Sequence, residues 1–147
     1  MIYLASFKGS GAGIGGIIDR GIRYICKGKY SHSEICVGQP FEDKVLCVSS
    51  RGMRGGVAGI CMRLSPDDYD LIPLPWVSEQ EVRDWLKAND GAKYDFIGVI
   101  RFMIPFVGGE HPTKWFCSEV AANIIGFADP WQFNPTTLAL VASKPYK

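Results

Sequence analysis

Cys117 and His32 are the two residues whose type and surroundings could support covalent chemistry. Cys117 lies in residues 114–120 (KWFCSEV), where an aromatic loop turns into a helix, and His32 lies in residues 30–35 (YSHSEI), at the start of a strand. A thiol at a helix N-terminus ionises more readily, because unpaired backbone N–H groups and the helix dipole favour the thiolate. A nearby histidine can take the thiol proton and return it to a leaving group. The pair suggests a cysteine hydrolase or acyltransferase.

Each of these residues also has a structural interpretation. Free cysteines are among the most buried residues, and a histidine beside a strand is more often a hydrogen-bonded structural group than a catalytic one. The other four cysteines, at positions 26, 36, 47 and 61, lie in apolar helix or strand patterns that suit core packing. His111 is the alternative base, but it lies in the loop segment 109–112 (GEHP), and a loop tip holds catalytic geometry poorly.

A third polar residue is expected to orient the imidazole of His32. A hairpin whose turn is centred between residues 40 and 41 would place Ser49 opposite His32, and a bulge would bring Ser50 there instead. Glu34, on the same strand face as His32, is the alternative by charge. A carboxylate stabilises an imidazolium electrostatically, whereas a hydroxyl only orients it.

Two further patterns suggest ligand binding. Arg51 and Arg54 lie beside glycines and could bind a substrate carboxylate, although solvated surface arginines are the more common case. Residues 11–16 (GAGIGG) match the GxGxxG pattern of dinucleotide-binding folds, with Glu34 at about the spacing of the ribose-binding acid. That acid belongs at the far end of its strand, however, and the chain lacks further βαβ units. We therefore expect no dinucleotide cofactor.

Composition excludes several other classes. The 147 residues form one expected domain (1–147), with 47% hydrophobic and 21% charged residues and a net charge of +1, which argues against nucleic-acid binding. With two histidines and five cysteines in no CxxC spacing, we expect no metal site. The apolar run at residues 96–107 is interrupted by Arg101 and Pro105, and it is shorter than the ~20 residues of a membrane span. Lacking a signal-peptide pattern, the chain is expected to be cytoplasmic with reduced thiols.

The residues that position these groups fall into strand-like and helix-like patterns. Apolar periodicity predicts a helix at 17–25, another within 96–106 and a third from Cys117 to Gly126, while Ser78 and Glu81 form a capping box that begins a helix ending near 89–91. Strands are predicted at 2–7, 32–37, 45–50, 60–64 and 69–74. The fold class is therefore α+β, an antiparallel sheet packed against helices.

Three segments together resemble one family. Residues 30–35 (YSHSEI), 94–98 (YDFIG) and 115–120 (WFCSEV) look like the circularly permuted branch of the NlpC-type, papain-like cysteine peptidase superfamily, which includes the YaeF/YiiX-like and lecithin:retinol acyltransferase-like proteins. In unpermuted members the histidine strand follows the cysteine, whereas here it comes first. Residues 49–57 (SSRGMRGGV) also resemble a segment of phage-encoded members.

The resemblance implies a permuted papain-like fold with Cys117 as nucleophile, His32 as general base and Tyr94 lining the site. Relatives take the third residue from the strand after the histidine, often an acid, histidine or asparagine, where this chain offers Ser49 or Ser50. The Cys117 backbone N–H, at the helix start, is the expected oxyanion donor. The implied chemistry is thiolate attack on an amide or ester carbonyl through an acyl-enzyme.

The expected function is therefore an amidase or peptidase that acts on bacterial cell-wall peptide and requires no cofactor. A lipid or other acyl substrate at the same site is the first alternative. A catalytically inactive phage structural or host-interaction protein of the same fold is the second. Without a leader, murein would be reached through host lysis or delivery in a virus particle.

Overall fold

The computed structural model describes residues 1–9, 13–52, 55–95 and 113–144. Strands in these residues form one sheet in the order β5-β1-β2-β3-β4-β6-β7, in which every neighbouring pair is antiparallel except β6 and β7. The strands are β1 (Ile2–Phe7), β2 (His32–Val37), β3 (Val45–Arg51), β4 (Gly56–Met62), β5 (Tyr69–Pro73), β6 (Lys93–Tyr94) and β7 (Lys114–Trp115).

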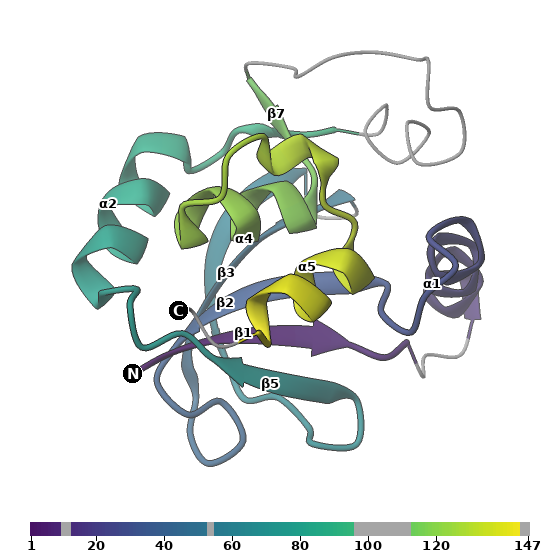
Figure 1. Ribbon diagram of the computed structural model, residues 1–147, viewed down its shortest axis with the longest axis horizontal. Helices are drawn as coiled ribbons and strands as arrows, with labels where there is room; N and C mark the ends of the chain where they lie inside the picture. The colour runs from purple at the N-terminus through teal and green to yellow at the C-terminus, as the bar shows by residue number, and fades with distance from the viewer. Residues whose placement is uncertain (10–12, 53–54, 96–112, 145–147) are drawn as a thin grey trace.

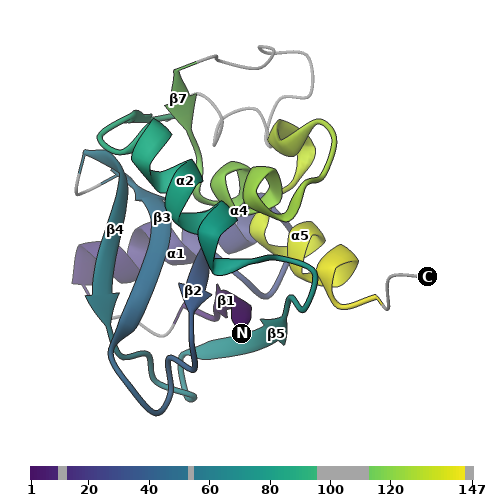
Figure 2. The ribbon, with the colours of Figure 1, turned by 90° about the vertical axis from the view of Figure 1, so that its left-hand side faces the viewer.

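The helices of the described residues are α1 (Gly13–Ile25), α2 (Glu79–Asn89), α4 (Cys117–Ile125) and α5 (Pro135–Ala142), with a short 3-10 turn η2 (Pro130–Gln132) between the last two. Helices α2, α4 and α5 cover one face of the curved sheet, and α1 lies apart from them, beyond the end of β1 (Figures 1 and 2). The molecule is thus an α+β protein with a mostly antiparallel sheet, as the sequence predicts.

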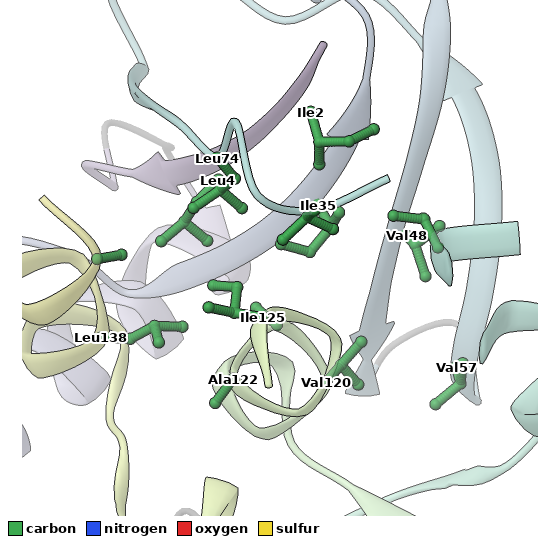
Figure 3. Packing of buried hydrophobic residues seen from close by; sticks show 14 residues of the cluster. Ile2, Leu4, Ile35, Val48, Val57, Leu74, Val120, Ala122, Ile125 and Leu138 are labelled. Atoms are coloured by element: carbon green, nitrogen blue, oxygen red, sulfur yellow. The ribbon is translucent and has the colours of Figure 1, made fainter. Parts of the chain in front are cut away.

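The main hydrophobic core lies between this sheet face and α4 (Figure 3). Alternate residues of a strand point to the same face, and the sheet contributes such residues from four neighbouring strands. These are Ile2 and Leu4 of β1, Ile35 of β2, Val48 of β3 and Val57 of β4. Helix α4 meets them with Val120, Ala121, Ala122 and Ile125. This packing fixes α4, whose first residue is Cys117, against the sheet.

Local signals set the ends of two helices where the sequence predicts them. At the start of α2, Ser78 and Glu81 make the predicted reciprocal capping box. At the start of α4, the Phe116 backbone N–H donates to the buried Glu119 carboxylate at 2.7 Å. Gly126 ends α4 with φ of +90°, a left-handed conformation that glycine adopts without steric cost.

Two elements begin earlier than predicted. Strand β4 begins at Gly56 rather than at residue 60. Glycine is required at this first position, because a Cβ on Gly56 would lie 2.0 Å from the Ala92 carbonyl oxygen. Helix α1 begins at Gly13 rather than at residue 17. The predicted helix within residues 96–106 lies outside the described residues.

Two short strands, β6 and β7, and helix α5 were not predicted. For α5 the sequence does carry a signal, since Asn134 caps the helix by accepting from two backbone N–H groups and Pro135 follows at its first position. Within the described residues, none of the helices is both long and apolar enough to cross a membrane.

The β2–β3 hairpin has a different register from the predicted one. Ile35, Cys36 and Val37 pair with Val48, Cys47 and Leu46, so the turn is centred between residues 41 and 42 rather than 40 and 41. Continued toward the strand ends, this register places Arg51, not Ser49, opposite His32. The shift is two residues, the side-chain period of a strand, so Ser49 still lies on the same face as His32.

Candidate active site

His32 begins β2, Cys117 begins α4, and the fold brings the two side chains together. The His32 side chain is 21% exposed and Cys117 is 1% exposed. Burial alone would lower the pKa of His32, but a charge on Cys117 and a hydrogen bond to it, together with Glu34, raise that pKa to about 10. The fold therefore brings a thiol and an imidazole within hydrogen-bonding distance of one another.

The Nε2 atom of His32 has two oxygen neighbours. Ser49 Oγ and Glu34 Oε1 each lie 3.3 Å from it. The Ser49 hydroxyl proton is directed to the Ser33 carbonyl oxygen at 2.7 Å, so the Ser49 oxygen can only accept from His32. Because both neighbours accept, they hold a proton on Nε2 and leave Nδ1 as the nitrogen for the Cys117 thiol.

Glu34 is a buried carboxylate in a network of charged and polar groups. Its side chain is 2% exposed, and Arg51 Nη2 lies 2.6 Å from Oε2, while the Tyr69 hydroxyl donates to Oε1 at 3.4 Å. Burial would raise the pKa of Glu34, but His32, Arg51 and Tyr69 together lower it. Glu34 is therefore ionised beside His32 and supplies the electrostatic support that a serine lacks.

Arg51 contacts Glu34 in the structure. Its side chain is 14% exposed and its Nη2 is directed at Glu34, on the side of Glu34 away from His32 Nε2. A buried carboxylate needs such a partner to stay charged. Arg51 therefore stabilises the charge of Glu34, and its binding of a substrate carboxylate stays a prediction.

Tyr94, at the end of β6, lies close to Cys117. Burial and the Cys117 charge both raise the pKa of Tyr94, so its hydroxyl is neutral at physiological pH. The Tyr94 ring packs edge-on against Phe116, with ring centroids 5.8 Å apart. Tyr94 thus lines the region around the thiol, next to the residue that precedes it.

Other candidates lie elsewhere. Ser50 alternates with Ser49 along β3 and so points to the opposite face. It is fully buried, and its hydroxyl has no hydrogen-bond partner among the described residues. Arg54 and His111 lie outside the described residues. Within the described ranges, no three histidine, cysteine or acidic side chains cluster as a metal site would require.

Two residues of the site were missed in the sequence analysis. Tyr69 contacts Glu34 from β5, a strand separated from β2 by β1. No local sequence pattern predicts a contact between such distant strands. Glu119 accepts a hydrogen bond from the Phe116 backbone N–H, immediately before the thiol. A cap residue three positions before a glutamate is the available signal for that bond.

Comparison with known proteins gives no match to any family model and none to any curated protein.

Proposed function

We propose that this protein is a cysteine hydrolase, an amidase or peptidase, with Cys117 as nucleophile and His32 as its acid–base partner. The observation that carries the proposal is the position of the His32 side chain, which shares a hydrogen bond with Cys117 at the start of α4 and lies 3.3 Å from the buried Glu34 carboxylate. A thiol, an imidazole and a carboxylate in this order are the groups that nucleophilic catalysis by cysteine requires.

The reaction follows from this arrangement. The Cys117 thiolate attacks the carbonyl carbon, a C–S bond forms, and the carbonyl electron pair moves to the oxygen. We expect the backbone N–H of Cys117, which has no intrahelical acceptor at the start of α4, to donate to that oxygen. His32 gives its proton to the leaving amine as the C–N bond breaks, and a thioester is left on Cys117.

Hydrolysis completes the cycle with the same residues. His32, now neutral, takes a proton from water, the hydroxide attacks the thioester, and the thiolate leaves. Glu34 stabilises the imidazolium formed in this step. We expect bacterial cell-wall peptide as the substrate, and an ester or lipid acyl group would pass through the same thioester.

Iodoacetamide labelling tests the pair before any substrate is known. Labelling rates at Cys117 and at the exposed Cys61 are followed by mass spectrometry in wild type and in His32→Ala. We expect the Cys117 rate to rise less steeply between about pH 6 and 8 than the Cys61 rate, because a neighbouring imidazolium favours the reactive thiolate. The comparison uses the shape of each pH profile, so the low exposure of Cys117 does not affect it.

The His32→Ala variant decides the interpretation. Loss of the shallower Cys117 profile in this variant would establish the activated pair. Parallel profiles at Cys117 and Cys61 in wild type would contradict the proposal and favour an inactive scaffold. With the pair established, release of amines from cell-wall peptides, compared with release of acids from esters, distinguishes an amidase from an acyl hydrolase, with Cys117→Ala as the inactive control.

A further inference from the structure

Two further cysteines, separate from Cys117, lie opposite one another in the sheet. Cys36 of β2 and Cys47 of β3 are directly opposite in the antiparallel register, and their Sγ atoms are 3.3 Å apart. Both are fully buried in the smaller hydrophobic cluster, with Ala5 and Leu64. Directly opposed residues of antiparallel strands have Cα atoms about 4.5–5.5 Å apart, which lies within the range of about 4.4–6.8 Å found for disulfides.

The pair is protected in the folded protein. The hydrogen bond between Cys36 and Cys47, together with burial, raises the pKa of Cys36. The reactive thiolate of Cys36 is therefore scarce while the strands are paired. Cys47 is additionally within 3.6 Å of the Val45 carbonyl oxygen. Exchange needs a thiolate and access, so these thiols are open to oxidation chiefly while the chain is folding.

We propose that Cys36 and Cys47 form a cross-strand disulfide when the protein folds in an oxidising environment. One thiol loses its proton and attacks a small-molecule disulfide such as oxidised glutathione, giving a mixed disulfide and one reduced glutathione. The second thiol then displaces the other glutathione. The two protein thiols are oxidised, an S–S bond forms between β2 and β3, and one glutathione disulfide is reduced to two thiols.

The location gives this bond a structural consequence. Strand β2 carries His32 and Glu34, and strand β3 carries Ser49 and Arg51. A covalent link between Cys36 and Cys47 fixes the register that brings these four side chains together. The proposal concerns folding and does not depend on the proposed function, since a protein without any activity would form the same bond.

Refolding of the full chain from the reduced, unfolded state tests the proposal. One sample refolds with oxidised and reduced glutathione, the other with reductant only, and both are then alkylated, digested and mapped. We expect a Cys36–Cys47 linked peptide in the first sample only. We also expect a Tm higher by roughly 5–10 °C, as closure of a short loop predicts for a protein of this size.

Two variants serve as controls. In Cys47→Ala the difference in Tm between the two samples should disappear, whereas in Cys61→Ala, which removes an exposed thiol, it should persist. Because each variant is compared with itself under two redox conditions, a general loss of stability does not affect the result. Linked peptides that involve other cysteines instead, or a Tm difference that survives Cys47→Ala, would overturn the proposal.

Discussion

Glu34 connects the candidate site to the rest of the sheet at the level of single residues. It lies between His32 and Arg51, with Tyr69 as a third partner, and it is almost fully buried. Ser49 touches the same nitrogen of His32 at the same distance of 3.3 Å but brings no charge. Of the two, the carboxylate is the group able to stabilise the imidazolium, so we assign it the larger effect on Cys117 reactivity.

Substitution of Glu34 by glutamine keeps the shape of the side chain and removes its charge. We expect the pKa of His32 to fall, because the charge that supports the imidazolium is gone, and the labelling rate of Cys117 near neutral pH to fall with it. Ser49→Ala, the matched control, should change that rate by less than about threefold, because it removes only an uncharged acceptor. The larger effect in Ser49→Ala would identify the serine as the orienting group.

At the level of secondary-structure elements, the candidate site is assembled from the ends of two strands and one helix. His32 begins β2, Cys117 begins α4, and Tyr94 ends β6, the strand that joins the sheet through Gly56 of β4. Gly56 has φ of +136° and no room for a Cβ beside the Ala92 carbonyl, whereas the neighbouring Gly55 has φ of +88° and open space around it. A side chain at Gly55 would therefore meet only backbone strain, whereas one at Gly56 would also clash with the Ala92 carbonyl.

Alanine at these two positions should have different effects. Gly55→Ala is expected to destabilise the protein by about 1–2 kcal/mol, the cost of a left-handed conformation. Gly56→Ala should cost roughly 3 kcal/mol or more, because it adds displacement of β6 to that strain. Urea unfolding measures both. In Gly56→Ala, the labelling rate of Cys117 should also change, because Tyr94 moves with β6. An equal loss of unfolding free energy in the two variants would contradict the steric requirement for glycine at position 56.

At the scale of the whole molecule, the charge state of His32 links the site to folding stability. The pKa of His32 in the folded protein, about 10, is above its ordinary value of 6.5. A raised pKa means that the folded state binds the proton more tightly than the unfolded state. The stabilising contribution of His32 is therefore complete below about pH 6.5 and is lost as the pH rises through about 10.

This contribution can be measured as a difference between proteins. We expect the free energy of unfolding of wild type minus that of His32→Gln to be constant below about pH 6.5 and to decline toward pH 10. NMR titration measures the pKa of His32 directly. Its signal is easily assigned, because the chain has only one other histidine, His111. In Cys117→Ala the pKa of His32 should fall, because the thiolate charge is gone. An unchanged His32 titration in that variant would show that the two residues do not interact.

The sequence by itself determined the features that depend on neighbouring residues. Strands β1 and β2, the capping box of α2 and the extent of α4 follow from short-range patterns of apolar spacing, caps and a terminal glycine. These patterns also indicated Cys117 and His32, because a thiol at a helix start and a histidine at a strand start are recognisable from a few residues on either side. Helix α5 carried a similar local signal that was not used.

Only the tertiary structure decided which side chains meet. The hairpin register depends on how many residues the turn uses, and sheet packing set it two residues away from the predicted one, which left Ser49 on the correct face. The partners of Glu34 come from β3 and β5, and Cys36 lies opposite Cys47 only in the observed register. Contacts of this kind depend on strand pairing and on burial against α4, which no local pattern encodes.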